Sequence, residues 1–251
     1  MNDMLILVAA VFLPLFPFSM LFNALHSGLR PPILRALLLL LWPQVGLLII
    51  DHNGLTPPGW LLAWAVLSSL LYALRALALR EVGMWIGFLA TSSWALIWLM
   101  LDQGLGAERL ARVALGISVP LVMLSILAAG LERRFGAAYL GLYGGLAQSM
   151  PRFAIMLVLV VLAVIATPLF PGFFAMLSMM IATMPSAPLL AVAIGVIWLL
   201  WSWAGARLLQ GLIVGPKTQA VDDLGGLGLG LYILLLAALI ASSGYWLEAI
   251  V

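Results

Sequence analysis

The sequence predicts an all-α integral membrane protein, a polytopic bundle of transmembrane helices. Hydrophobic residues make up 65% of the chain, charged residues only 8%, and the mean hydropathy is +1.22. A soluble domain carries roughly 25% charged residues, because its outside must face water. The apolar residues also form long runs, such as MLVLVVLAVIATPLF, rather than the short alternating segments of membrane β-barrels. These observations exclude a soluble globule and favour membrane-spanning helices.

A helical crossing needs about 20 apolar residues, and by this rule the chain contains about eight or nine spans. We expect them to form a single transmembrane domain over residues 1–251, with a retained first helix, because no basic lead or cleavage site marks a signal peptide. The number is nine if the short segment 172–184 crosses the membrane, and eight if it does not. The other expected spans are residues 4–25, 33–50, 60–79, 83–101, 110–131, 153–170, 188–214 and 225–246.

Proline lies inside several of these spans, where it removes a backbone hydrogen bond and kinks or breaks the helix. Simple kinks are common in membrane bundles, because neighbouring helices satisfy the freed carbonyls. The alternative is a broken helix of a transport protein, whose exposed backbone ends bind ions. Pro43 is the best candidate, since Gln44 would place a polar side chain beside the break. We therefore predict at least one broken helix, in the span 33–50.

Ionisable side chains inside a membrane are costly and mark functional sites, yet none lies in the central turns of an expected span. All nine acids lie at span ends or in loops, as do His26 and His52, and Arg75 is the deepest base. The basic residues divide into two sets across the membrane. Because the division depends on the number of spans, it assigns no orientation. The first set is Arg30, Arg35, Arg75, Arg80, Arg133, Arg134 and Arg152, and the second is Arg109, Arg112, Arg207 and Lys217.

The remaining polar side chains inside the spans are neutral. They are typical of residues that join helices through hydrogen bonds of roughly 0.6–2 kcal/mol each, and a water-filled path is the alternative. These residues are Ser19, Asn23, Gln44, Ser92, Ser93, Ser118, Ser178, Thr183 and Ser202. Among the aromatic residues, Trp60, Tyr245 and Trp246 lie at span ends as interface anchors. The deeper Trp198, Trp201 and Trp203 are expected to pack against a partner or lipid.

Patterns for catalysis, cofactors and metals are absent. The chain has no cysteine, which excludes disulfides, iron–sulfur ligation and thiolate zinc sites, and two histidines at span ends do not suit a bis-histidine haem. No GxSxG, HExxH or P-loop pattern occurs, and GGLGLG near Gly225 opens an apolar helix without a preceding strand. The scattered basic residues form no nucleic-acid footprint. We expect no enzyme activity, cofactor, metal site or nucleic-acid partner.

Three stretches, taken in order, resemble the antiporter-like membrane subunits of complex I, Mrp antiporters and related hydrogenase and inorganic-carbon uptake complexes. FPFSMLFNALHSGLRPPILRALLLLLWPQVG is similar to the family's stretch from a Pro-Leu-His-x-Trp-Leu-Pro element to a lysine in a broken helix. YGGLAQSMPRFAIMLVLVVLAVIATPLFPGF and LLAVAIGVIWLLWSWAGARLLQGLIVGP are similar to the Gly-Gly-Leu…Pro-Gly element and the helix that follows it. The resemblance covers most of the chain and implies a partial antiporter-like fold.

The departures from the family pattern concern its titrating residues. The chain is similar to the later portion of these subunits, without the first of their two inverted repeats and its intramembrane glutamate. Gln44 falls where the broken helix carries lysine, and Arg80 is nearest to the lysine of the next motif. Gly116 and Met179 fall where the family has a histidine or lysine and a glutamate. The resemblance therefore implies a proton path that is absent or supplied by another chain.

The expected function is that of a membrane subunit in a multisubunit energy-coupling complex, linked to redox chemistry, antiport or inorganic-carbon uptake. A stand-alone transporter or channel for a neutral small solute is the alternative. Expected partners are lipid and other membrane subunits, including a complete antiporter-like subunit or a chain that supplies the first repeat. The resemblance implies the cytoplasmic (inner) membrane of a prokaryote. The candidate remnants of an ion path are Ser19, Asn23, Gln44, Arg75, Arg80 and Glu81.

Overall fold

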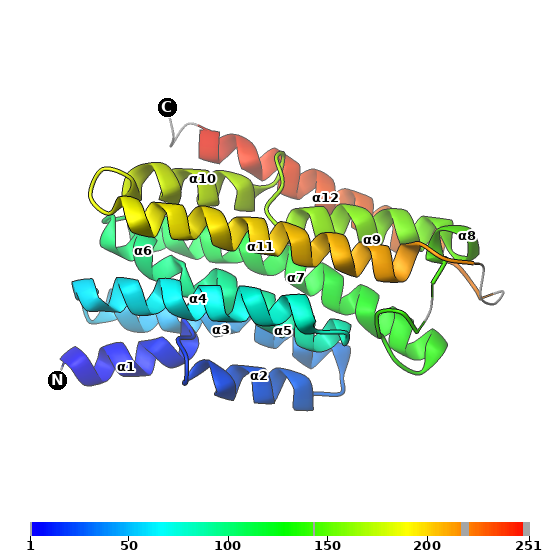
Figure 1. The fold of residues 1–251 in the computed structure, drawn as a ribbon, viewed down its shortest axis with the longest axis horizontal. Coiled ribbons are helices and arrows are strands. Elements are labelled where there is room, and N and C mark those ends of the chain that lie inside the picture. Colours follow the sequence, from blue (N-terminus) through cyan, green and yellow to red (C-terminus); the bar gives the residue numbers. More distant parts are fainter. Residues whose placement is uncertain (1, 143, 217–220, 248–251) are drawn as a thin grey trace.

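The computed structural model describes residues 2–142, 144–216 and 221–247 of the chain, so Lys217 and Glu248 lie outside it, as do the side chains of Tyr245 and Trp246. Within these ranges the protein is an all-α bundle whose long helices run side by side (Figure 1). The helices are α1 (Asn2–Phe12), α2 (Ser19–Gly28), α3 (Pro32–His52), α4 (Gly59–Ala78), α5 (Val82–Ala95), α6 (Ile97–Asp102), α7 (Ala107–Phe135), α8 (Leu146–Ser149), α9 (Pro151–Val164), α10 (Pro171–Thr183), α11 (Pro188–Ile213) and α12 (Gly226–Leu247).

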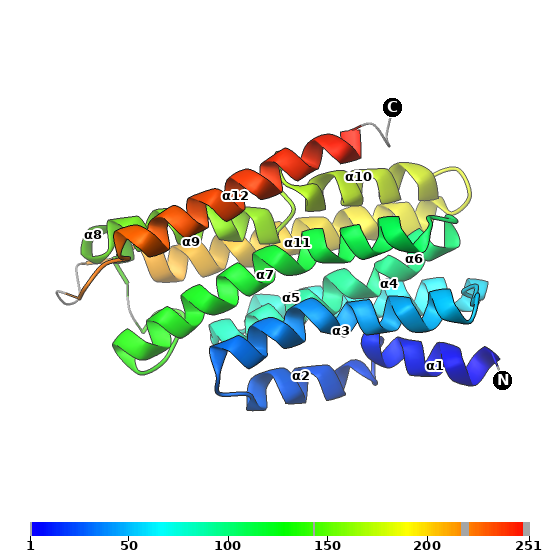
Figure 2. The ribbon, with the colours of Figure 1, turned by 180° about the vertical axis from the view of Figure 1, so that it is seen from behind.

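The described residues form eight crossings. Six are helical stretches long and apolar enough to span a membrane: α3, α4, α5 with α6, α7, α11 and α12. Two more are pairs of shorter helices that lie end to end, α1 with α2 and α9 with α10 (Figures 1 and 2). The segment 172–184 is therefore the second half of the sixth crossing and not a ninth span.

Both broken crossings carry the same tetrapeptide, Pro-Leu-Phe-Pro, at residues 14–17 and 168–171. Two prolines three residues apart remove two N–H donors, and each disfavours the helical conformation for the residue before it. The helix consequently stops before each tetrapeptide, at Phe12 and at Val164. The two broken crossings run in opposite directions through the bundle (Figure 1).

The predicted break at Pro43 is wrong. Pro43 lies inside the continuous helix α3, and Pro120 likewise lies inside α7. A single proline removes one backbone hydrogen bond, and the residues on either side of it can still form theirs. The helix therefore continues across the proline. A broken helix exists, as the sequence predicted, but it lies one span earlier, and a second one forms the sixth crossing.

The crossing formed by α5 and α6 is the centre of the bundle. Of the residues in its most apolar window, 89% are buried, compared with 28% for α3 and 22% for α12. Small residues let its neighbours approach, as where Gly87 of α5 faces α2 so closely that a Cβ atom would lie 2.9 Å from the Asn23 Oδ1 atom. Close approach at small residues is the usual basis of helix association in membranes.

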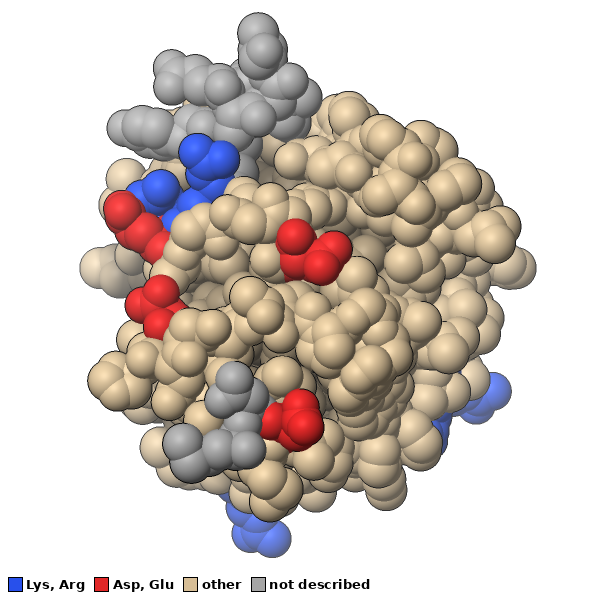
Figure 3. All heavy atoms as spheres, turned by 90° about the vertical axis from the view of Figure 1, so that its left-hand side faces the viewer, with Lys and Arg blue, Asp and Glu red and all other residues tan. Residues whose placement is uncertain are grey.

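The arginines gather at one end of the bundle. With eight crossings, Arg207 joins the first set defined from the sequence, so eight of the ten arginines lie at the end where α2 meets α3. We call this the arginine-rich end. The opposite end carries Asp3, Asp51, Asp102 and Glu108, with Arg109 and Arg112 as its only arginines, and Figure 3 shows its scattered carboxylates. We call it the acidic end.

The asymmetry predicts an orientation, because Lys and Arg are retained on the cytoplasmic side. We expect Arg133, at the arginine-rich end, to face the cytoplasm and Asn53, in the loop after α3, to face the opposite side. The chain has no cysteine, so single Arg133→Cys and Asn53→Cys variants can be labelled with a membrane-impermeant maleimide. Intact cells should label only the Asn53→Cys variant, and lysed cells both. Labelling of Arg133→Cys alone in intact cells would reverse the assignment.

Candidate functional site

The first broken crossing is closed by tryptophan side chains. Trp98 donates its indole N–H to the carbonyl oxygen of Leu13 (3.0 Å), and Trp64 donates to that of Phe16 (2.7 Å). Trp42 donates to the carbonyl oxygen of Val11 (3.0 Å). In a bilayer, backbone groups freed by a break must find partners within the protein. Here indole donors from α3, α4 and α6 pair three of the backbone carbonyl oxygens at or beside the break.

The second broken crossing is closed in the same way. Trp198 of α11 donates to the carbonyl oxygens of Ile165 (3.3 Å) and Ala166 (3.1 Å). Ser243 of α12 donates to the carbonyl oxygen of Leu169 (2.7 Å). Ala166 and Leu169 have positive φ angles of 57° and 91°, which L-residues rarely adopt and which cost free energy. The neighbouring helices α11 and α12 hold this strained link in place by donating hydrogen bonds to its carbonyl oxygens.

These contacts change the interpretation of the deep tryptophans. Trp198 and the buried Trp201 act as hydrogen-bond donors inside the bundle, and Trp201 donates to Ser92 Oγ (2.8 Å). Of the three, only Trp203, which is 59% exposed, has the outward position expected of a residue that contacts lipid or a partner. Trp198 and Trp201 point inward because a buried indole N–H in a membrane requires an acceptor, which the bundle interior provides.

A cluster of neutral side chains lies beside the first break. The hydroxyl groups of Ser19 and Tyr72 are 2.6 Å apart. The amide of Asn23 donates to the Ser19 carbonyl oxygen and to Thr91 Oγ1, both at 3.0 Å. The structure thus brings two of the candidate ion-path residues together, Ser19 and Asn23. It joins them to α4 and α5 by hydrogen bonds.

Neutral hydrogen bonds continue through the middle of the bundle. Ser69 and Ser92 Oγ atoms are 3.0 Å apart, which links α4 to α5. Trp94 donates to Ser118 Oγ (3.2 Å), which links α5 to α7. Because every member is neutral and already paired, these residues hold helices together and offer no group that changes charge.

The other candidate residues lie elsewhere. Gln44, half-buried in α3, donates its amide N–H to the Ala111 carbonyl oxygen of α7 (3.2 Å). Arg75 is exposed, with its guanidinium 5.2 Å from the centre of the Phe88 ring, and is not the most enclosed base. Arg80 is exposed in the link before α5. Glu81 accepts a hydrogen bond from the Tyr139 hydroxyl (3.3 Å), and the negative charge of Glu81 raises the pKa of Tyr139.

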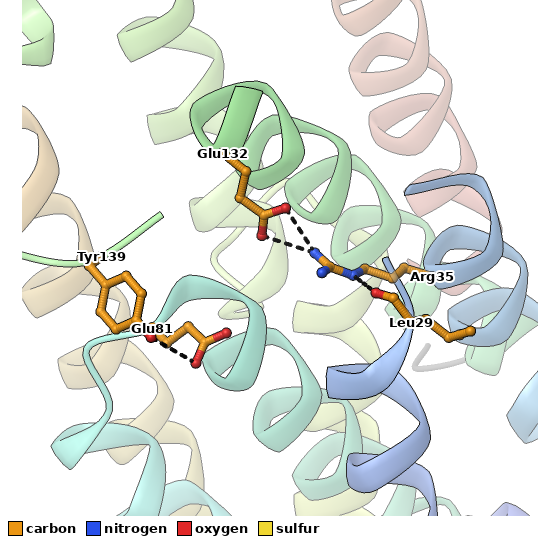
Figure 4. A network of polar contacts seen from close by, with 5 residues as sticks. All are labelled: Leu29, Arg35, Glu81, Glu132 and Tyr139. Atoms are coloured by element: carbon orange, nitrogen blue, oxygen red, sulfur yellow. Dashed lines mark hydrogen bonds and ion pairs between the residues drawn. The ribbon is translucent and has the colours of Figure 1, made fainter. Parts of the chain in front are cut away.

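An ion pair that the sequence did not single out connects α3 and α7 (Figure 4). One guanidinium nitrogen of Arg35 contacts both carboxylate oxygens of Glu132, at 2.9 and 3.2 Å, and the Arg35 Nε atom donates to the Leu29 carbonyl oxygen (2.6 Å). The two side chains are only 14% and 32% exposed. Both residues lie near span ends, where charged side chains usually face water, so sequence position alone gave no signal of a pair.

His26 also lies at a span end, in the last turn of α2, but it is buried. Its ring stacks on Phe22, with 5.7 Å between ring centroids, and its Nε2 atom has no hydrogen-bond partner within the described residues. Gly116 lies against the ring of Pro171, and the Met179 side chain is buried in the apolar core. Neither position carries an ionisable group.

A carboxylate fixes the link before α12 to the bundle. Asp223 accepts hydrogen bonds from the backbone N–H groups of Arg152 and Phe153, both at 2.9 Å, in the first turn of α9. Partial burial alone would raise the pKa of Asp223, but these N–H groups stabilise the charged form and hold the pKa below its usual value. All described acids lie at helix ends or in links, as the sequence predicted.

No protein-family model and no curated protein sequence matches the chain. Solved structures do match it. A chain of respiratory complex I from Thermus thermophilus with bound NADH matches with a TM-score of 0.85 and 26% identity, over 94% of this chain and 52% of that one. The resemblance to antiporter-like subunits is confirmed. This chain has a partial antiporter-like fold.

Two further structures share the fold. A chain of the Mrp complex from Dietzia sp. DQ12-45-1b matches with a TM-score of 0.77 and 19% identity, over 91% of this chain and 44% of that one. A chain of the membrane-bound sulfane sulfur reductase, an archaeal respiratory membrane complex, matches with a TM-score of 0.81 and 18% identity, over 96% of this chain and 52% of that one. This antiporter-like membrane chain therefore spans about half the length of the chains it matches.

Proposed function

We propose that this antiporter-like chain is a supporting subunit of a multisubunit energy-coupling complex in a prokaryotic cytoplasmic membrane, without a complete proton path of its own. The observation that carries the proposal is the closure of both broken crossings by indole and hydroxyl donors. In transport proteins, the unwound backbone of broken helices coordinates the transported ion. Here Trp98 and Trp198 already occupy those carbonyl oxygens.

The charge distribution supports the same proposal. A proton relay needs titrating groups or ordered water within hydrogen-bond reach along the path. The polar side chains beside the breaks, such as Ser19, Asn23 and Thr91, are neutral. They can hold water but cannot store a proton. On this proposal the chain is not an enzyme, and acids of a partner chain carry the protons.

Proton flux through the assembled complex tests the proposal. Gln44→Leu removes the amide at the position where the family carries lysine, and Ser19→Ala removes a hydroxyl beside the first break. We expect both variants to leave flux within about twofold of the unmodified complex, measured in vesicles and normalised to assembled complex. Substituting intramembrane acids of the partner should abolish flux. A large loss for Gln44→Leu at unchanged assembly would instead identify a working path through this chain.

The proposed partners are other membrane subunits, among them a complete antiporter-like subunit or a chain that supplies the first repeat. Two observations support this proposal: the similar chains belong to multisubunit membrane complexes, and α3 and α12 present mostly unburied faces. We expect a tagged chain to co-purify with other membrane subunits in mild detergent and to aggregate when expressed alone. A monodisperse, folded monomer after size exclusion would argue for the stand-alone transporter.

A further inference from the structure

An apolar groove opens between α7 and α12 near the acidic end. It has a volume of about 680 Å³ and is lined mainly by apolar side chains, including Leu115, Val119 and Leu239. Its size lies in the range of roughly 300–1,000 Å³ typical of small-molecule sites. Water fills such a space poorly, because an ordered water needs two to four polar partners.

A second, polar hollow adjoins this groove. It has a volume of about 460 Å³ and lies over the link at residues 103–106 and Glu108. Arg109 and Arg112 line both spaces. Arg109 and Arg112 therefore lie where the polar hollow meets the apolar groove.

The charges of these two arginines distinguish the site. They are the only arginines at an end that otherwise carries acids. Arg112 forms an ion pair with Glu108, and both side chains are largely exposed. The Arg109 guanidinium has no hydrogen bond or ion pair within the described part of the chain. A phosphate would satisfy it well, because a guanidinium presents paired N–H donors that match phosphate oxygens.

We propose that the groove binds a glycerophospholipid, with its phosphate between Arg109 and Arg112 and an acyl chain along Leu115, Val119 and Leu239. The polar hollow takes the headgroup. An apolar partner helix would leave the Arg109 charge without a counter-ion in a desolvated interface, which costs free energy. A single phospholipid molecule can fill both the polar hollow and the apolar groove, because it carries a polar headgroup and apolar acyl chains.

Photo-crosslinking of the full chain, reconstituted into vesicles together with the subunits that co-purify with it, tests this proposal. The probe is phosphatidylglycerol with a diazirine in the middle of one acyl chain, added as a trace to phosphatidylcholine. We expect more adducts on residues 115–119 and 235–239 than on the exposed Leu67 and Leu74 of α4, which report bulk lipid. Arg109→Gln with Arg112→Gln should lower the groove adducts about fivefold to tenfold, because charge-assisted contacts are lost.

Two further variants separate recognition from folding. Arg133→Gln, at the other end of the same helix α7, should leave all adducts unchanged. Ala238→Phe fills the groove while keeping both arginines, and should also remove the groove adducts at unchanged labelling of α4. Equal labelling by a diazirine-bearing diacylglycerol, or equal labelling of the groove and α4, would overturn the proposal. So would crosslinks in native membranes from a neighbouring subunit, instead of lipid, at residues 235–239.

Discussion

Replacing Trp98 by phenylalanine is expected to lower the melting temperature of the assembled protein by roughly 6–12 °C. Trp98 is fully buried, and its indole N–H is the donor to the Leu13 carbonyl oxygen at the first break. Phenylalanine keeps the aromatic ring but removes the donor, and an unsatisfied buried carbonyl costs about 1–3 kcal/mol. The smaller ring also leaves a cavity, which brings the expected loss to about 3 kcal/mol.

Trp203→Phe is the matched control. Trp203 is 59% exposed, and its indole has no hydrogen bond within the described residues, so the same change should shift stability by no more than about 0.5 kcal/mol. Thermal unfolding followed by size exclusion in detergent measures both variants. Equal stability of Trp98→Phe and the unmodified protein would show that water or another donor satisfies the break, and would weaken the case for a closed crossing.

Arg35→Leu is expected to lower the melting temperature by roughly 4–8 °C, corresponding to about 2 kcal/mol. The substitution leaves the Glu132 carboxylate half-buried without its partner and also frees the Leu29 carbonyl oxygen between α2 and α3. Breaking a fully buried pair costs about 3–5 kcal/mol and an exposed pair less than about 1 kcal/mol, and this pair lies between them.

Two controls make the Arg35 result specific. Arg112→Leu breaks the exposed pair with Glu108 and should cost no more than about 0.5 kcal/mol. The double variant Arg35→Leu with Glu132→Leu removes both charges, and should recover most of the lost stability because an apolar pair can replace an ion pair. A double variant less stable than Arg35→Leu alone would show that the carboxylate has another stabilising role.

The helical class and most crossings follow directly from hydropathy, because a bilayer admits few alternatives. The position of the breaks did not follow from single prolines. Pro43 and Pro120 lie inside continuous helices, whereas the helices end before the paired prolines of residues 14–17 and 168–171. The repeated Pro-Leu-Phe-Pro tetrapeptide was the available signal, since two closely spaced prolines remove two backbone donors within one turn.

The candidate site was predicted in part. The buried Ser19 and the half-buried Asn23 could be singled out, because the spans contain few polar side chains. Their partners could not, since Tyr72 and Thr91 come from other helices. The role of the tryptophans as hydrogen-bond donors could not be predicted either, because their acceptor carbonyl groups belong to residues far away in the sequence.

The separation of charge between the two ends also bears on how the protein is inserted. In the expected orientation, the loops at residues 53–58, 103–106 and 184–187 are carried outward, and each joins two crossings into a helical hairpin. An inside-negative potential contributes about 2.3 kcal/mol per unit charge per 100 mV. The potential therefore favours outward movement of Asp51 and Asp102. Because Arg112 pairs with Glu108, Arg109 is the one arginine that is exported without a counter-ion in the described structure. Biogenesis of this bundle should consequently be assisted by an energised membrane and slow when the potential is dissipated.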